Sequence, residues 1–384
     1  MKVSKSLVEE YFNELEDPRD SRGKRHDLLE IILLAIVGSI CKTDDWEEIV
    51  AICEAKEDWL RTFLDLKHGI PSHDTFERVF AEINPKEFAN CFTAWSQALA
   101  TITEGAIVAI DGKTLRSSYE NSSKKSALHL VNVWCCSNGL SLGQVAVDKK
   151  SNEITAIPEL IRLLDLNKKI VTIDAMGCQK EIAKDIRKAK ADYVLALKGN
   201  QGLFHKNVKS FLDKGIEEGF KREYDFFETK FEKDHGRIEK LLCYTVPLTE
   251  WDIKEKLFDN ITAWKDLKTV FVVESQKYDV KTKKETSQRR YYITSLNLSA
   301  EELLNIVRSH WNIENNLHCI LDVVFREDES RVRKDNAPQN LAMARKIALN
   351  LLKKDSESKK SLKTRRVKAA SSNQYLQDIL FQNS

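Results

Sequence analysis

The chain has 384 residues, which is long enough for two or three domains with a proper buried core. Its formal net charge is only +2, which excludes a protein that is basic over its whole surface. The eight cysteines are scattered without a C-x-x-C pair, a pattern that indicates free thiols rather than disulfides or a cysteine metal site. The most apolar stretch, 28–41, contains Glu30 and is too short to span a bilayer, so we expect a cytoplasmic protein without membrane contact.

Basic residues are nevertheless concentrated near the carboxyl terminus. From Arg326 to Lys368 there are fourteen Lys or Arg residues against six Asp or Glu residues. A local basic surface of this kind fits a polyanionic partner, although a run of charges is more often a solvated face.

The first part of the chain, 1–104, is predicted to be entirely helical. Apolar residues recur at helical intervals in 28–41 and 44–64. The segment 69–80 predicts a turn followed by a helix that Ser72 or Asp74 caps. Two helices joined by such a turn occur in helix-turn-helix DNA readers and equally in plain helical packing units, so both alternatives stay open.

From Gly105 the pattern changes to strands. Strands are predicted at 106–111, 128–135, 140–147, 170–174 and 192–199, with helices at 155–164 and near 179–189. This order of elements is that of the ribonuclease-H-like fold, in which acidic residues on the first and fourth strands meet. We therefore predict an α/β protein with a ribonuclease-H-like catalytic core.

Two of these strands end in an aspartate. AIVAIDG (106–112) and IVTIDAMG (170–177) are continuous β-branched runs, which indicate strands buried on both faces of a sheet. Asp111 and Asp174 would then emerge at the carboxyl edge of the sheet, where open α/β sheets bind ligands. Capping of the following turn is the simpler alternative for each aspartate alone.

The second half of the chain alternates between strands and helices. The segment 222–296 is rich in strands and is predicted to be an insertion, with a hairpin that turns at 234–236. Helices are predicted at 300–319 and 339–354, and a Lys- and Ser-rich tail is expected to be mobile until a short helix near 374–380. The predicted domains are 1–104 (helical), 105–221 (core, first part), 222–299 (β-rich insertion), 300–354 (core, second part) and 355–384 (basic tail).

A third carboxylate is needed, because two aspartates alone make a weak metal site. Glu314 lies four residues after His310 and four before His318, so the three side chains share one face of the predicted helix. Apolar neighbours indicate that this helix is largely buried, so its carboxylate needs partners. Three converging acids need a cation, and oxygen ligands favour Mg²⁺ or Mn²⁺.

Longer motifs extend over nearly the whole chain. They are GIPSHDTFERVF (69–80), AIDGKTLRSS (109–118), SNEITAIPELI (151–161), IVTIDAMGCQKEIA (170–183), YVLALKGNQ (193–201), HGRIE (235–239), HWNIENNLHCILDVVFREDESRVR (310–333) and ARKIALNLLKKD (344–355). Together these motifs resemble the DDE transposases of bacterial insertion sequences, most closely the H-repeat-associated (ISAs-type) group.

The resemblance implies both a site and a reaction. Carried over by position, Asp111, Asp174 and Glu314 are the catalytic triad, which would hold two divalent ions about 3.5–4 Å apart. Water would cut DNA at the element's ends, and the freed 3′-hydroxyl would attack target DNA. The expected partners are therefore double-stranded DNA and other copies of the chain assembled on it. The predicted DNA-contacting residues are Lys113, Arg116, Lys198, Arg237, Arg331 and Arg333.

The sequence also departs from the wider superfamily, which places Tyr, Arg and Lys where this chain has Val307, His310 and Leu321. The role of that arginine therefore does not transfer to His310. The alternatives that remain are a nuclease of the same fold without strand transfer, a DNA-binding relative without catalysis, and a zinc protein that uses His310, Glu314 and His318.

Overall fold

The structure is a computed structural model, and it describes residues 7–20, 24–100, 102–118, 127–147, 153–234, 237–254, 257–258, 260–355 and 358–381. The chain forms two compact units. The first unit comprises Met1–Ile102, Gly112–Asn152 and Ile313–Ser384, and the second comprises Thr103–Asp111 and Glu153–Asn312. The five-part division predicted from the sequence stays a prediction.

The first unit is mainly helical. Its helices are α1 (Leu7–Phe12), α2 (Leu28–Ile40), α3 (Trp46–Ala55), α4 (Glu57–Leu60), α5 (His73–Glu82), α6 (Pro85–Leu99), α12 (Cys319–Val323), α13 (Ala337–Lys354), α14 (Leu362–Ser371) and α15 (Asn373–Phe381). Aspartates at the helix starts explain two boundaries, because Asp27 accepts a hydrogen bond from the Glu30 N–H and Asp45 from the Glu48 N–H. The helices predicted at 28–41 and 339–354 are confirmed.

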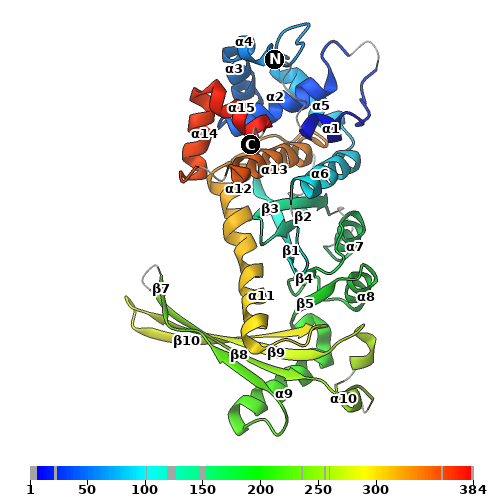
Figure 1. Cartoon of the computed structure of the whole chain (residues 1–384), viewed down its shortest axis with the longest axis vertical. Coiled ribbons are helices and arrows are strands. Elements are labelled where there is room, and N and C mark those ends of the chain that lie inside the picture. The colour runs from blue at the N-terminus through cyan, green and yellow to red at the C-terminus, as the bar shows by residue number, and fades with distance from the viewer. Residues whose placement is uncertain are drawn as a thin grey trace. The chain divides into compact units, whose positions relative to one another are not determined.

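Helix α13 is the centre of this unit and packs against α2, α5 and α6 (Figure 1). Its buried polar residues tie separate segments together. The Asn340 side-chain amide donates to the carbonyls of Phe80 and Ile83, and Asn350 exchanges hydrogen bonds with the Ser141 backbone. Because buried polar groups are costly unless they are paired, these bonds fix the position of α13.

The same unit contains the hairpin predicted at 128–147. Strands β2 (Leu128–Cys135) and β3 (Leu140–Ala146) are antiparallel, and Gly139 in the turn has a φ of 64°, which glycine adopts without strain. On the sheet, β2 lies between β3 and β1 (Ile107–Leu115), a strand that has residues in both units. Leu115, Leu130 and Ala342 form a small buried cluster under these strands.

The second unit is built on the rest of the sheet, in the strand order β1, β4, β5, β10, β9, β8 and β6, with β7 paired to β8. The strands are β4 (Ile170–Ile173), β5 (Asp192–Leu197), β6 (Asp225–Glu228), β7 (Glu232–Asp234), β8 (Arg237–Pro247), β9 (Thr269–Asp279) and β10 (Lys284–Thr294). Its helices are α7 (Glu153–Leu163), α8 (Lys180–Lys188), α9 (Gly202–Glu218), α10 (Glu250–Lys254) and most of α11 (Ala300–Ile313).

Strands β1, β4 and β5 are parallel, whereas β5 and β10 are antiparallel. The β-rich segment therefore continues the same sheet, a feature that its prediction as an insertion did not include. Figure 1 shows the long strands β8, β9 and β10 of this extension. Side chains of β8–β10 and α11, such as Phe271, Tyr292 and Leu303, form a common hydrophobic core. The turn predicted at 234–236 lies partly outside the described residues.

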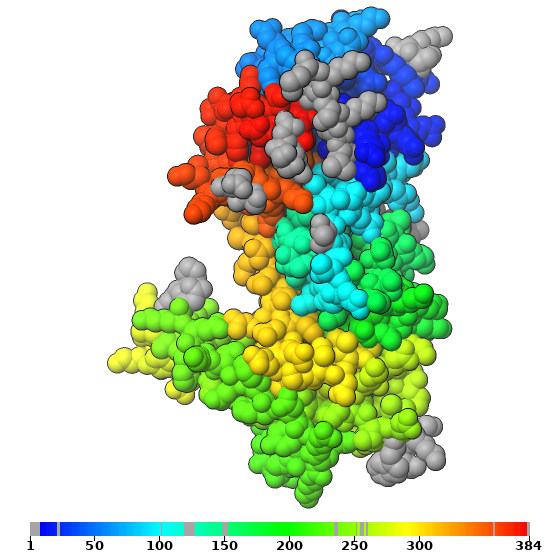
Figure 2. Space-filling view, viewed as in Figure 1, coloured from blue at the N-terminus to red at the C-terminus, as the bar shows by residue number. Residues whose placement is uncertain are grey.

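The carboxyl-terminal tail contains more helix than predicted. The short helix near 374–380 is confirmed as α15, but the expectation of a mobile segment before it is wrong for α14. Arg366 of α14 is buried, lies over the Phe325 ring and donates to the Ser39 carbonyl. Figure 2 shows the carboxyl-terminal residues (red) beside the amino-terminal helices (blue), where Lys56 donates to Asn373.

The fold is therefore mixed α/β, as the sequence predicts. Among the described residues, no helix combines the length and the apolar composition that crossing a membrane requires.

Candidate active site

Asp111 and Asp174 lie at equivalent positions on neighbouring strands. In the parallel pair of β1 and β4, Ile110 is the register partner of Ile173, and the next residue in each case is an aspartate, Asp111 within β1 and Asp174 directly after the end of β4. Both aspartates belong to the second unit. The sequence predicts that the first of these strands ends at Asp111, but β1 continues to Leu115, so Asp111 lies within its strand and only Asp174 lies after the end of its strand. The meeting of the two acids at one edge of the sheet stays a prediction.

The loop after β4 holds Asp174 in a defined position. Its Oδ1 accepts hydrogen bonds from the backbone N–H groups of Met176, at 3.0 Å, and Gly177, at 3.4 Å. Burial and the nearby Glu153 raise the pKa of Asp174, while these two N–H groups and Lys198 act in the opposite direction.

Two amide side chains of the segment after β5 fix the same loop from outside. Asn200 donates to the Ala175 carbonyl at 2.7 Å, and Gln201 donates to the Cys178 carbonyl at 2.7 Å. The sequence pattern predicted the strand at 192–199 and a role for Lys198, but it indicated no role for Asn200 or Gln201. A pair of amide residues directly after a strand that neighbours an acid-ended strand was the available signal.

Gly177 is required in this loop by close packing. A Cβ atom at this position would lie 2.3 Å from Cγ2 of Ile173 and 2.7 Å from Cδ1 of Ile157. Any larger residue would therefore push the loop away from β4 and displace Asp174.

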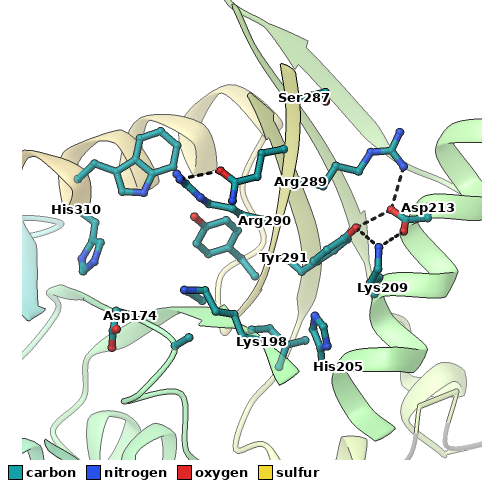
Figure 3. Close-up of a pocket in the computed structure, with 16 residues that line it drawn as sticks. Asp174, Lys198, His205, Lys209, Asp213, Ser287, Arg289, Arg290, Tyr291 and His310 are labelled. Atoms are coloured by element: carbon teal, nitrogen blue, oxygen red, sulfur yellow. Dashed lines mark hydrogen bonds and ion pairs between the residues drawn. The ribbon is translucent and has the colours of Figure 1, made fainter. Parts of the chain in front are cut away.

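A cavity of about 880 Å³ opens beside Asp174 within the second unit (Figure 3). Its walls come from the end of β4 and from β5, α9, β10 and α11. Six of its side chains are basic, and they are Lys198, His205, Lys209, Arg289, Arg290 and His310. Only Asp174 and Asp213 among its lining residues are acidic. Such a surface attracts an anionic ligand toward Asp174.

In the wall of the cavity opposite Asp174, charged and polar side chains are hydrogen-bonded to one another (Figure 3). Asp213 accepts hydrogen bonds from Lys209 at 2.6 Å, from the Tyr291 hydroxyl at 2.7 Å and from Arg289 at 3.0 Å. Arg290 lies over the Trp311 ring instead, 4.9 Å from its centroid. Arg290 and the exposed Lys198 are therefore better placed to meet a phosphate than the residues around Asp213.

His310 is another part of this cavity. Its Nδ1 lies 2.9 Å from the Thr172 hydroxyl, which belongs to β4 two residues before Asp174. The sequence left the role of His310 open. The contact of His310 with Thr172 links α11 to β4, the strand that Asp174 follows.

Glu314 belongs to the first unit, in a π-helical turn (Glu314–His318) that follows α11. Such turns are rare and frequently mark functional sites. The Glu314 side chain is 70% exposed, so the expectation of a buried carboxylate is wrong. Its Oε2 lies 3.0 Å from Nδ1 of His318, which is buried. Burial, Lys113 and Lys346 lower the pKa of His318, while Glu314 acts in the opposite direction.

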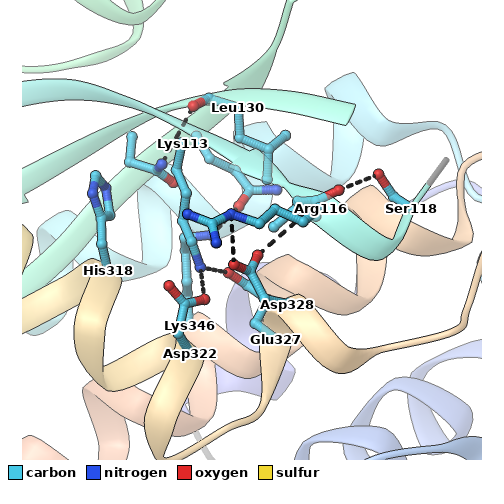
Figure 4. A network of polar contacts seen from close by, with 12 residues as sticks. Lys113, Arg116, Ser118, Leu130, His318, Asp322, Glu327, Asp328 and Lys346 are labelled. Atoms are coloured by element: carbon cyan, nitrogen blue, oxygen red, sulfur yellow. Dashed lines mark hydrogen bonds and ion pairs between the residues drawn. The ribbon is translucent and has the colours of Figure 1, made fainter. Parts of the chain in front are cut away.

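Lys113, two residues after Asp111, is also in the first unit and is buried (Figure 4). Its ammonium group lies 2.5 Å from Asp322 and 2.6 Å from Glu327. Burial alone would lower its pKa, but these two carboxylates raise it. The charge of Lys113 is therefore paired with carboxylates of the protein itself. The contact of Lys113 with DNA stays a prediction.

The other predicted DNA-contacting residues differ in exposure. Arg116 is exposed beside Asp328, Arg331 is exposed, and Arg237 is exposed near Asp279. Arg333 instead donates to the Ser117 carbonyl at 2.9 Å and is partly buried.

The donor groups in the second unit fit a divalent cation. Asp111 and Asp174 follow paired residues of adjacent strands, and two carboxylates that come close together repel each other unless a cation lies between them. Carboxylate oxygens are the ligands that Mg²⁺ and Mn²⁺ prefer.

Comparisons with known proteins point to one family. The family model described as Transposase DDE domain matches residues 103–351, and a DDE_Tnp_1-associated model matches residues 9–96. The putative transposase YncI of Escherichia coli O157:H7 is 40% identical, over 97% of this chain and 93% of its own length. The H repeat-associated putative transposase YhhI of Escherichia coli K12 is 38% identical, over 97% of each chain.

A solved structure of the piggyBac transposase synaptic complex with hairpin DNA also matches. It covers 96% of this chain and 76% of its own, with 11% identity and a TM-score of 0.42.

Proposed function

The chain belongs to the transposase DDE domain family, and we propose that it cuts DNA at the ends of its element and joins those ends to target DNA. The observation that supports this proposal is the pairing of β1 with β4, in which Asp111 and Asp174 each follow the last paired residue, together with the basic cavity that Asp174 lines. We further propose that the core is ribonuclease-H-like, because β1, β4 and β5 are parallel and the antiparallel β2 and β3 follow on the other side of β1.

In this proposal Glu314 completes the site with Asp111 and Asp174. The three carboxylates would hold Mg²⁺ or Mn²⁺, which neutralises charge on the phosphodiester and activates the attacking oxygen. The π-helical turn and the buried His318 support a defined position for Glu314. Asn200 and Gln201 keep Asp174 oriented through its loop.

The chain's own cations position the DNA. Lys198 and Arg290 would bind phosphates next to the bond that breaks, because both line the cavity that contains Asp174. Water then breaks a phosphodiester and leaves a 3′-hydroxyl, and that hydroxyl attacks a target phosphodiester and displaces its 3′-oxygen. Phosphoryl transfer of this kind depends mainly on positioning and charge neutralisation.

Arg116, Arg331 and Arg237 are the exposed residues that we propose as further phosphate contacts, outside the cavity. Assembly as a homo-oligomer on DNA in the bacterial cytoplasm belongs to the same proposal, since both element ends must be held together for joining.

The test is cleavage and joining of a duplex that carries the element's terminal sequence, with a supercoiled plasmid as target and Mg²⁺ present. Wild-type protein should cut and join, and Asp174→Asn should do neither while it still binds DNA. Asp165→Asn is the matched control, because Asp165 is an exposed acid whose carboxylate accepts from the Asn167 N–H. Cleavage without joining would instead identify a nuclease, and binding without either would identify an inactive relative.

A further inference from the structure

A second cavity, of about 280 Å³, lies within the first unit among its amino-terminal helices. It is lined by two arginines, two histidines and two hydroxyl residues, together with Ile70. The six polar residues are Arg25, His26, His68, Ser72, Thr75 and Arg78. Every one of these side chains can donate a hydrogen bond, and none of the described residues that line the cavity is acidic.

Positive charge is concentrated around His26. Its ring lies 6.2 Å from that of His68, centroid to centroid. Arg19 donates to the His26 carbonyl at 2.8 Å and is held there by Asp17. Burial lowers the pKa of His26, and the charges of Arg25, His68 and Arg19 lower it further. A bound anion would relieve this repulsion.

Helix α5 starts at the same cavity. Ser72 is the residue before its first turn, and its hydroxyl lies 3.1 Å from the Thr75 hydroxyl instead of capping a backbone N–H. The partial positive charge of the helix start therefore adds to the charges of Arg25 and Arg78.

We propose that these six residues, which we call the amino-terminal anion site, bind a phosphate group of the DNA backbone. Two guanidinium groups match phosphate geometry, and Arg25, His68, Ser72 and Arg78 are exposed, so a long polyanion can reach them. A contact of this kind sets the position of the duplex without selecting its base sequence. The inference rests on the proposed function only for its choice of DNA as the polyanion.

The first test measures DNA affinity against salt concentration by fluorescence anisotropy, with the catalytically silent Asp174→Asn protein as background. In that background the double substitution R25Q/R78Q should reduce the slope of log affinity against log salt by about 0.9, the value for one phosphate. The reduction should be the same for duplexes of different sequence. Arg61→Gln is the matched control, because Arg61 is already paired with Glu57 at 2.7 Å, and it should leave the slope unchanged.

The second test needs no substitution. The His26 and His68 ring signals are followed by NMR against pH, with and without a short duplex, and separately with inorganic phosphate. A higher pKa for His26 with the duplex supports the site. Unchanged slopes together with unchanged ring signals would overturn it, and a response to inorganic phosphate but not to DNA would identify a small-anion site instead. Because none of these readouts involves cleavage, failure of the anion site and failure of the proposed transposase activity are distinguishable.

Discussion

The Lys113 ammonium group lies 2.6 Å from the Glu327 carboxylate, with side-chain exposures of 7% and 0%. Asp322 of α12 accepts from the same ammonium group, and Lys346 of α13 lies near Glu327 and donates to Gln144 (Figure 4). This network fixes the end of β1 to the helices of the first unit.

Replacing Lys113 with methionine should lower the free energy of unfolding of this unit by about 3–5 kcal/mol, because Glu327 would keep a buried charge with one partner fewer. The loss should lie near the lower value, since Lys346 and Arg345 still act on Glu327. Urea unfolding measures this loss in the free energy of unfolding. The control is Lys184→Met, whose pair with Glu181 is exposed and should change stability by less than about 1 kcal/mol. Equal losses of stability in Lys113→Met and Lys184→Met would contradict the assignment of Lys113 to a buried ion-pair network.

Glu327 should also give the protein an acid-sensitive stability. Burial alone would raise its pKa, but Lys346, Lys113 and Arg345 lower it to about 2, from an ordinary value of 4.5. A depressed carboxyl pKa contributes stability above pH 4.5 that is lost as the pH falls toward 2. The stability difference between wild type and Glu327→Gln should therefore narrow by about 3 kcal/mol over this window. A difference that stays constant with pH would show that Glu327 is not held as a charged group.

The sequence was sufficient to predict the two strands that carry or precede the aspartates, because the pattern is local. Continuous Val and Ile runs mark strands buried on both faces, and both runs do form strands. However, β1 continues past Asp111 to Leu115, so only Asp174 lies after the end of its strand. The strong helical period of 339–354 predicted α13 for the same reason. Features that need only a few consecutive residues were therefore predictable.

Features that depend on distant partners were not predictable. Arg366 is buried because its guanidinium group donates to the Ser39 carbonyl and lies over the Phe325 ring, and both partners are far away in the chain. Its neighbours in sequence look solvated. Glu314 is exposed at a π-helical turn, and a helical period read from the sequence does not show such a turn. The pairing of β5 with β10 likewise joins segments about a hundred residues apart.

DNA binding should depend on salt through the exposed basic residues near the carboxyl terminus. Neutralising Arg331, Lys359 and Lys360 together should reduce the slope of log affinity against log salt by about 0.9 for each phosphate that the protein no longer neutralises. Arg365 and Arg366, part of the same charge excess, are unsuitable for this test because both donate to backbone carbonyls. Fluorescence anisotropy at several salt concentrations measures the slope, with Lys184→Gln as control. An unchanged slope would show that the DNA-binding surface lies elsewhere in the protein.

Asn200→Ala should reduce cleavage by about 10–100-fold and raise the Mg²⁺ concentration that cleavage requires, because the Ala175 carbonyl loses the donor that fixes the loop of Asp174. DNA affinity should stay close to that of wild type. Asn297→Ala is the control, since Asn297 is an exposed asparagine of the same unit. Cleavage rates measured across a series of Mg²⁺ concentrations give both the loss of activity and the Mg²⁺ requirement. An unchanged Mg²⁺ requirement would show that Asn200 does not support the site.

Mg²⁺ should stabilise the protein through the triad. If Asp111, Asp174 and Glu314 converge, the metal-free protein holds three like charges close together, and a cation relieves their repulsion. Binding then adds RT ln(1 + [Mg²⁺]/Kd) to the free energy of unfolding, about 1.4 kcal/mol when the ion is tenfold above its Kd. Thermal melting with and without Mg²⁺ measures this as a rise in Tm.

Replacing any one of the three acids with its amide should shrink that rise and abolish cleavage, while the metal-free protein keeps its fold and gains slightly in Tm as repulsion falls. Asp165→Asn should do neither, whereas Asp192 cannot serve as a control because it pairs with Arg187 and Ser295. The three acids must respond alike, since each would supply ligands to the same cations. A Glu314→Gln protein that kept the full Mg²⁺-induced rise in Tm and the wild-type rate of cleavage would show that the third carboxylate lies elsewhere.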